Sequence, residues 1–121
     1  MERVIIYDKD DSFVELLSKR LCADNTTIVV EQYTNIDDLR DALIKNVDEY
    51  IFSIIDIDTQ EDKCESVLSL ISSQYIPILV LTALNNATLR DNLILNYPII
   101  DFATKDSTKN FYYISSLITH M

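Results

Sequence analysis

Five short apolar runs alternate with segments of helical periodicity along this chain of 121 residues. The runs are rich in β-branched and aromatic residues and cover residues 3–7, 27–33, 50–56, 76–82 and 98–104. Strands that alternate with helices favour one parallel sheet, because right-handed crossovers then place helices on both of its faces. The pattern therefore predicts a single α/β domain with five strands and five helices.

The segments between and after these runs repeat their apolar residues every three or four positions, which is typical of helices that pack on one side. They cover residues 11–21, 35–46, 61–74, 85–96 and 107–121. Two apolar stripes are expected to face the core: Phe13, Leu16, Leu17 and Leu21 in the first helix, and Ile36, Leu39, Leu43 and Ile44 in the second. In the last helix, the stripe is expected to leave Tyr112 or Tyr113 outward.

Polar residues within the pattern add two local predictions. Asn35 is predicted to cap the second helix, and Asn85 or Asn86 the fourth, because an Asn side chain accepts a hydrogen bond from the first free N–H groups of a helix. Glu31 and Gln32 interrupt the second strand, whereas central parallel strands are almost continuously apolar. The second strand is therefore expected at an edge of the sheet.

The composition disfavours several classes of function. With 20 acidic and 10 basic residues, the chain has a formal net charge of -10, which opposes direct binding to the phosphates of nucleic acids. It contains no Gly, whereas the phosphate loops of dinucleotide-binding and P-loop folds need Gly for close approach of the backbone. A flavin or nucleotide carrier is disfavoured for the same reason.

No apolar run approaches the roughly 18 residues of a membrane-spanning helix, and charged residues follow the N-terminus too closely for a secretory signal. We therefore expect a cytoplasmic domain that does not contact membranes directly. Cys22 and Cys64 are far apart in the sequence and predict neither a disulfide nor a zinc site.

Polar residues of distinct chemistry follow the predicted strands where each strand ends. The first strand leads into Asp8, Lys9, Asp10 and Asp11, the third into Asp56 and Asp58, the fourth into Thr82 and Ala83, and the fifth into Thr104 and Lys105. In open α/β sheets, the binding crevice lies outside the carboxyl ends of the strands. We therefore expect carboxylates, a hydroxyl group and an amine to meet at one edge of the sheet.

This set of groups has the chemistry of a phosphoryl acceptor. Clustered carboxylates favour a hard cation such as Mg²⁺, which binds one or two protein carboxylates together with phosphate oxygens and water. Asp56 is placed to act as a nucleophile that forms an aspartyl phosphate. Thr82 is placed to donate a hydrogen bond to the phosphoryl group, and Lys105 to supply a point charge.

Four segments resemble the receiver domain of two-component response regulators, in the order and at the spacing of that family. They are VIIYDKDDSF, YIFSIIDID, PILVLTA and DFATKD. The resemblance extends over essentially the whole chain, so it implies one receiver domain over residues 1–121. It also implies a three-layer (βα)5 flavodoxin-like sandwich, whose parallel sheet of five strands has the order 2-1-3-4-5 and carries helices on both faces.

By this resemblance, Asp56 is the phosphoacceptor, and Mg²⁺ is held by Asp8, Asp56 and the main-chain carbonyl of Asp58. The sequence departs from the family at Lys9, which stands where receivers commonly carry a second metal-site acid. The Lys9 ammonium either repels Mg²⁺ and pairs with Asp8 or Asp56 in its place, or is a surface charge. Asp10 is either a replacement metal ligand or a residue of the helix start, where the helix dipole favours an acid.

The resemblance also implies how such a domain works. Thr82 and Lys105 form the signalling pair, and Phe102 is the aromatic residue that swings inward on activation. The phosphoryl group comes from a histidine kinase or a phosphotransfer protein, and the chemistry of the domain is limited to phosphoryl transfer to Asp56 and hydrolysis from it. The fourth helix, fifth strand and fifth helix form the readout face and a candidate homodimer face.

Two functions remain open from the sequence. The first is a phosphorylatable aspartate switch in a histidine-kinase phosphorelay, as the input domain of a longer protein such as a diguanylate cyclase, because residues 99–118 resemble receivers attached to such domains. The second is an atypical receiver-like interaction module that is not phosphorylated, because Lys9 replaces the second metal-site acid. Further departures favour the second function: no Pro or Gly follows Asp56 closely, and Asp106 follows Lys105 where receivers usually have Pro.

Overall fold

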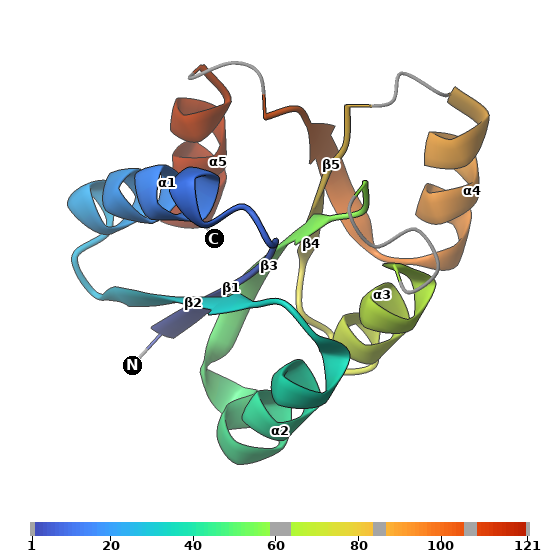
Figure 1. Ribbon diagram of the computed structural model, residues 1–121, viewed down its shortest axis with the longest axis horizontal. Coiled ribbons are helices and arrows are strands. Elements are labelled where there is room, and N and C mark those ends of the chain that lie inside the picture. Colours follow the sequence, from blue (N-terminus) through green and yellow to red (C-terminus); the bar gives the residue numbers. More distant parts are fainter. Residues whose placement is uncertain (1, 59–63, 84–86, 106–108, 121) are drawn as a thin grey trace.

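Strands and helices alternate along the chain, as the apolar periodicity predicts (Figure 1). The structure, a computed structural model, describes residues 2–58, 64–83, 87–105 and 109–120. Its elements are β1 (Glu2–Tyr7), α1 (Asp11–Asp24), β2 (Ile28–Tyr33), α2 (Ile36–Asn46), a 3-10 helix (Val47–Glu49), β3 (Tyr50–Asp56), α3 (Cys64–Ser72), β4 (Ile78–Leu81), α4 (Ala87–Asn96), β5 (Ile99–Ala103) and α5 (Lys109–Thr119).

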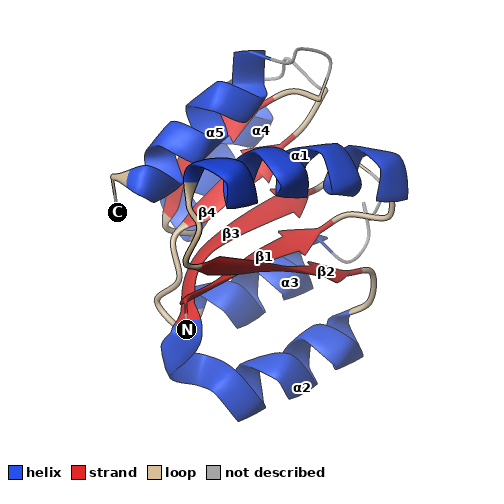
Figure 2. Cartoon of the chain, turned by 90° about the vertical axis from the view of Figure 1, so that its left-hand side faces the viewer, coloured by secondary structure: helices blue, strands red, loops and turns tan. Residues whose placement is uncertain are grey.

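The strands form one parallel sheet with the order β2-β1-β3-β4-β5. Helices α1 and α5 lie together on one face of this sheet, and α2 and α3 lie on the other (Figures 1 and 2). Leu93 of α4 joins the core cluster of α2 and α3, so α4 covers that second face as well. The predicted three-layer sandwich and its strand order are confirmed.

The second strand lies at an edge of the sheet, as its polar residues predict. Glu31 is half-buried and Gln32 is exposed. By contrast, all four residues of β4 are buried. In β3, every residue is buried except the half-buried Ile51. Strands covered on both faces are thus nearly continuous in apolar character, whereas the edge strand tolerates side chains that need water or a polar partner.

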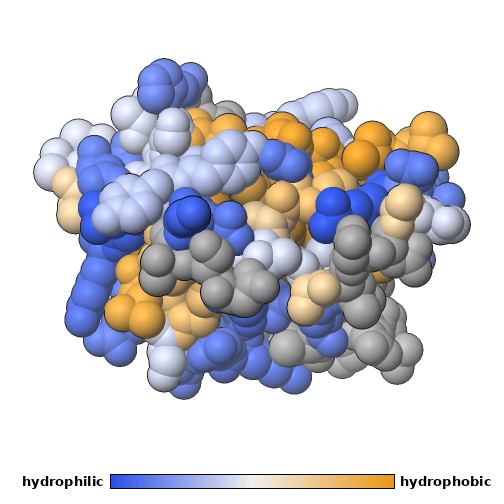
Figure 3. Space-filling model, turned by 90° about the horizontal axis from the view of Figure 1, so that it is seen from above, coloured by the Kyte–Doolittle hydropathy of each residue, from blue (hydrophilic) through white to orange (hydrophobic). Residues whose placement is uncertain are grey.

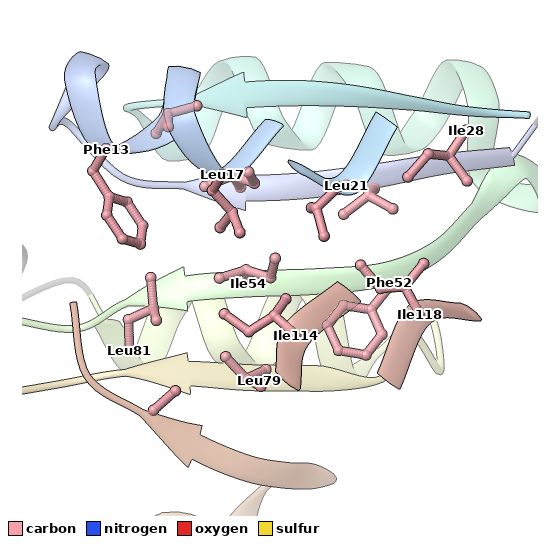
Figure 4. Close-up of a cluster of buried hydrophobic side chains, with 14 residues drawn as sticks. Phe13, Leu17, Leu21, Ile28, Phe52, Ile54, Leu79, Leu81, Ile114 and Ile118 are labelled. Carbon is pink, nitrogen blue, oxygen red and sulfur yellow. The ribbon is translucent and has the colours of Figure 1, made fainter. Parts of the chain in front are cut away.

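The core is divided by the sheet into two layers. The first lies between the sheet and helices α1 and α5, where Phe13, Leu17 and Leu21 of α1 meet Ile114 and Ile118 of α5 (Figure 4). The second lies between the opposite face and helices α2, α3 and α4. Fully burying a Leu or Ile side chain contributes about 1.5–3 kcal/mol, so these layers are the main source of stability.

Two residues of the predicted helix stripes are not in the core, and here the expectation was wrong. Leu16 is 57% exposed and Ile44 is 74% exposed, whereas Val14, which the stripe did not include, is buried. Each helix packs on the sheet through a narrow strip of its surface, so a side chain at the border of the stripe remains in solvent. One of Tyr112 and Tyr113 was expected to face outward, and the structure exposes both.

Helix caps agree with the sequence where the structure describes them. The side-chain oxygen of Asn35 accepts a hydrogen bond from the N–H of Asp38 at 2.9 Å, as expected for the start of α2. The cap predicted from Asn85 or Asn86 lies outside the described residues. Cys22 is an exposed free thiol. Within the described part of the chain, none of the helices has the length and apolar content needed to cross a bilayer.

Candidate functional site

The parallel register brings three polar residues to the same rim of the sheet. Tyr7 pairs with Ile55 between β1 and β3, so the following residues, Asp8 and Asp56, lie side by side. Asp56 in turn pairs with Leu81 of β4, the residue before Thr82. Each of the three polar residues is only 2% exposed. The rim therefore holds two carboxylates and a hydroxyl group that are removed from bulk water.

Lys105, from the segment after β5, joins the two carboxylates. Its Nζ lies 2.7 Å from Oδ2 of Asp8 and 2.9 Å from Oδ2 of Asp56. The same ammonium lies 4.9 Å from the centre of the Phe13 ring, within range of a cation–π interaction. The structure thus brings together three of the residues that the sequence places at the strand ends, and Lys105 bridges the two acids.

The two aspartates are held in the same way by their own loops. Oδ1 of Asp8 accepts a hydrogen bond from the N–H of Asp10 at 2.9 Å, and Oδ1 of Asp56 accepts one from the N–H of Asp58 at 2.9 Å. Each carboxylate therefore directs one oxygen at its own backbone and the other at the Lys105 ammonium. This geometry fixes the orientation of both acids before any ligand arrives.

Within the part of the chain that the structure describes, the two buried carboxylates of this site share the Lys105 ammonium. Burial raises the pKa of Asp8, although Lys105 and the Asp10 N–H oppose that shift. Oδ2 of Asp8 is buried, and no donor among the described residues gives it a well-directed hydrogen bond, so its contact with Lys105 is chiefly ionic. Burial alone would lower the pKa of Lys105, but the two aspartates outweigh it and raise that pKa.

A third carboxylate, that of Asp58, engages the end of β4. The Thr82 hydroxyl donates a hydrogen bond to Oδ1 of Asp58 at 2.8 Å, and the N–H of Ala83 donates one to Oδ2 at 2.6 Å. The family resemblance implied a role for Asp58 through its main-chain carbonyl only. The spacing carries a signal for the backbone, since Asp58 follows Asp56 at the same interval as Asp10 follows Asp8, but none for the side-chain contact.

The remaining members of the first acidic cluster face away from Lys105. Asp10 caps α1, because its side chain accepts a hydrogen bond from the N–H of Phe13 at 3.1 Å. Lys9 is exposed and forms no ion pair with the residues that the structure describes. Among the described residues, the cation in contact with Asp8 and Asp56 is Lys105 and not Lys9, and the surface-charge alternative for Lys9 agrees with the structure.

Gln32 is a residue of the site that sequence reasoning missed. Its Nε2 donates hydrogen bonds to the main-chain carbonyl of Asp8 at 2.9 Å and to the side chain of Asp11 at 2.8 Å. The N–H of Asp8 donates to the carbonyl of Tyr33 at 3.1 Å. The edge strand β2 thus positions the backbone that carries Asp8.

Phe102 lies on β5, away from the Lys105 contacts. Its ring is half-buried, and the guanidinium carbon of Arg90, from α4, lies 5.3 Å from the ring centre. The ring packs at the border of the second core layer. Movement of this ring on activation stays a prediction.

The described residues contain no group of three or more Asp, Glu, His or Cys side chains that could hold a metal ion. They do offer the paired carboxylates of Asp8 and Asp56, with one negative charge more than Lys105 neutralises. One or two carboxylates suffice for Mg²⁺ when phosphate oxygens and water complete its shell, so the donor set fits this ion.

No protein-family model matches the sequence, and no curated protein matches it. Solved structures do match. A response regulator receiver protein from Burkholderia phymatum superposes with a TM-score of 0.75 at 17% identity, over 98% of this chain and 94% of that chain. The beryllofluoride-activated NtrC receiver domain superposes with a TM-score of 0.67 at 16% identity, over 98% of this chain and 95% of that chain. This chain has the receiver-domain fold.

The receiver fold also matches part of a longer protein. A protein described as a two-component system response regulator/GGDEF domain protein superposes with a TM-score of 0.74 at 20% identity, over 98% of this chain and 46% of that chain. At identities of 16–20%, these similarities establish the fold. The function has to be argued from the side chains at the rim of the sheet.

Proposed function

We propose that this receiver domain is a phosphorylatable aspartate switch, and that Asp56 accepts a phosphoryl group from the phosphohistidine of a histidine kinase or phosphotransfer protein. The observation that carries the proposal is the Lys105 bridge between two buried aspartates at the carboxyl rim of the sheet. An ion pair that served stability alone would gain little from burial, because desolvation of the charges offsets their attraction. A buried acid with a raised pKa, such as Asp8, beside a second carboxylate is instead typical of chemistry.

In the transfer step, a carboxylate oxygen of Asp56 attacks the phosphorus atom, and a P–O bond forms. The P–N bond to the donor histidine breaks, and its electron pair returns to the ring nitrogen, which takes up a proton. The product is an aspartyl phosphate, an acyl phosphate that water can hydrolyse. Lys105 is placed to stabilise the negative charge that spreads over the phosphoryl oxygens during this step.

In this proposal, the carboxylates of Asp8 and Asp56 and the main-chain carbonyl of Asp58 hold Mg²⁺. When bound, the ion neutralises charge on the phosphoryl oxygens. Asp8 supplies the excess negative charge, and its Oδ2 is the buried oxygen without a directed hydrogen bond. Asp10 is a weaker candidate ligand, because metal binding would break its cap on α1.

The readout face is proposed to lie on α4, β5 and α5. These elements expose Ile94, Leu95, Ile100, Tyr112 and Tyr113. Seen from above, hydrophobic residues form a band along one edge of the molecule (Figure 3). Exposed apolar side chains on adjacent elements suit a protein contact, either with a second copy of the domain or with an output domain such as a diguanylate cyclase.

The test is phosphorylation by a small-molecule donor. Purified protein is incubated with acetyl phosphate and Mg²⁺, and its intact mass is measured with and without the ion. We expect one phosphate adduct on the wild type and none on Asp56→Asn. If an authentic receiver is labelled in the same buffer and this protein is not, the proposed function is wrong.

A second function, an interaction module that is not phosphorylated, is favoured by Lys9 at the usual position of a metal-site acid. Under this alternative, the wild type binds no Mg²⁺ at the rim. Lys9→Asp should then create the affinity, because it adds a carboxylate and removes a positive charge beside Asp8. Calorimetric titration with Mg²⁺ on both proteins separates the two functions.

A further inference from the structure

We propose that the Asp58 carboxylate is an internal competitor for the phosphoryl site: it occupies the Thr82 hydroxyl and the Ala83 N–H, the donors that a phosphoryl group on Asp56 would need. This inference rests on the proposed function, because it concerns the acceptor site of the same reaction. The inference assigns to the Asp58 side chain control over the rate and extent of phosphorylation, a role that its position in the sequence does not indicate.

The contacts of Asp58 match those of an anion bound at the end of β4. Its two carboxylate oxygens lie 2.8 Å from the Thr82 hydroxyl oxygen and 2.6 Å from the Ala83 nitrogen. Both donors are thus directed at one anionic group, one from a side chain and one from the backbone. Hydrogen bonds to a charged acceptor are shorter and stronger than those between neutral groups.

The backbone holds Asp58 in position for this contact. Its own N–H donates to Oδ1 of Asp56 at 2.9 Å, which ties the start of the loop to the acceptor aspartate. The same short segment therefore binds Asp56 through its backbone and the end of β4 through its side chain. A phosphoryl group on Asp56 would enter the space between these two contacts.

Charge makes the two anions exclusive. A phosphoryl group and the Asp58 carboxylate cannot both approach Thr82 and Ala83, because like charges at hydrogen-bond distance repel strongly in a partly buried site. Phosphorylation must therefore displace Asp58 from both donors. The fraction of molecules with Asp58 displaced limits the apparent rate and extent of the reaction.

The same contact biases Thr82 before any reaction takes place. The Asp58 carboxylate already binds the Thr82 hydroxyl on the side of Asp56. In the unphosphorylated domain, Thr82 therefore has part of the orientation that we expect it to have when Asp56 is phosphorylated. Removing the Asp58 carboxylate should accordingly release Thr82 and increase the difference in Thr82 orientation between the unphosphorylated and the phosphorylated domain.

The experiment compares four proteins in saturating Mg²⁺ and acetyl phosphate: wild type, Asp58→Ala, Asp58→Asn and Glu15→Gln. The last is the matched control, since it removes one negative charge from an exposed side chain of α1 that pairs with Lys19. The initial rate of phosphate incorporation is followed by intact mass. Hydrogen exchange of the Ala83 amide, measured by NMR without acetyl phosphate, reports the contact directly.

We expect Asp58→Ala to incorporate phosphate about tenfold faster than the wild type, which corresponds to ~1.4 kcal/mol. This is near the low end of what a hydrogen bond to a charged group contributes. Exchange of the Ala83 amide should accelerate in the same variant. Asp58→Asn, which keeps a single acceptor oxygen and no charge, should lie between the two, and Glu15→Gln should match the wild type in both measurements.

The outcomes that overturn the inference are distinct from failure of the proposed function. Unchanged hydrogen exchange of the Ala83 amide in Asp58→Ala overturns the inference, because the hydrogen bond to Asp58 then does not protect this amide in solution. Equal labelling rates for the wild type and Asp58→Ala also overturn it, while the labelling itself supports Asp56 as the acceptor. If no protein is labelled, Asp58→Ala included, the proposed function fails and the inference fails with it.

Discussion

Two clusters in this protein have the same charge ratio, two acids around one cation, but opposite surroundings. Near the amino ends of β1 and β3, Arg3 pairs with Glu31 and Glu49. At the carboxyl rim, Lys105 pairs with Asp8 and Asp56. The side chains of Glu31 and Glu49 are 20% and 36% exposed, whereas those of the two aspartates are 0% and 2% exposed.

The clusters also differ in how their acids are satisfied. Oε1 of Glu31 accepts hydrogen bonds from the hydroxyl groups of Tyr50 at 2.7 Å and Tyr33 at 3.0 Å, and Oε2 is bound by Arg3. The Arg3 hydrogen bond lowers the pKa of Glu49, whereas burial raises the pKa of Asp8. Folding therefore favours the charged form of Glu49 in the Arg3 cluster and disfavours that of Asp8 in the Lys105 cluster, and a buried acid held at such a cost points to function.

The largest expected difference between the clusters is the effect of removing the cation. Lys105→Met should lower the free energy of unfolding by roughly 3 kcal/mol at neutral pH, because it removes the ammonium that contacts both buried carboxylates. Arg3→Met should lower it less, since water reaches the acids of that cluster. Urea denaturation followed by circular dichroism measures both, and an equal or larger loss for Arg3→Met would contradict this assignment of roles.

The second prediction concerns Asp8 and has a defined pH dependence. Because its folded pKa lies above the unfolded value of about 3.9, its contribution is favourable below about pH 4 and is lost as the pH rises through the folded pKa. Asp8→Asn fixes the uncharged form. We therefore expect this variant to be more stable than the wild type at pH 7 by on the order of 1 kcal/mol.

The measurement for Asp8 is a series of urea denaturation curves between acid and neutral pH in the presence of a metal chelator. The stability difference between Asp8→Asn and the wild type should shrink toward zero below about pH 4, where both side chains are uncharged. A difference that stays constant over this range, or a less stable variant at pH 7, would show that Lys105 compensates Asp8 fully.

Glu49 should behave in the opposite sense. Its folded pKa lies below the unfolded value, so its contribution is present above the unfolded pKa and is lost as the pH falls through the folded pKa. Glu49→Gln should therefore be less stable than the wild type at neutral pH, and the two proteins should converge in acid. The effect is expected to be smaller than that of Asp8→Asn, because this ion pair is exposed to solvent and salt screens it.

The fold could be predicted from the sequence because its signals are local and repeated. Each strand and helix has its own apolar period, and Glu31 and Gln32 identified the edge strand without any knowledge of its neighbours. The exposure of Leu16 could not be predicted in this way. It depends on how α1 is rotated about its axis on the sheet. The spacing of apolar residues determines this rotation only to within about one residue position.

The site was predictable to the extent that the sheet determines it. Parallel strands end at a common rim, so the meeting of Asp8 and Asp56 followed from their positions at the ends of strands. The contact of Asp58 with Thr82 depends instead on the backbone dihedral angles of a loop, which the residue types do not fix.

The smallest expected effect is spectroscopic and tests the hydrogen bonds of the Arg3 cluster. Burial raises the pKa of Tyr50, and its hydrogen bond to the Glu31 carboxylate raises it further. The pKa of Tyr33 is raised chiefly by burial as well. The tyrosinate absorbance of the folded protein should therefore still be incomplete above the ordinary tyrosine pKa of about 10, with part of the amplitude appearing only on alkaline unfolding.

Tyr50→Phe removes one of the seven tyrosines of the chain. The tyrosinate absorbance that appears only on alkaline unfolding (the late phase) should decrease, and the absorbance that appears near the ordinary tyrosine pKa (the early phase) should not change. Because the folded pKa is raised, the stability that Tyr50 contributes is present below about pH 10 and is lost at higher pH. The variant should accordingly unfold at nearly the same alkaline pH as the wild type, but with a smaller late amplitude. Loss of amplitude from the early phase instead would mean that the Tyr50 hydroxyl ionises freely. The Arg3 cluster would then lack the hydrogen bonds that distinguish it from the Lys105 cluster.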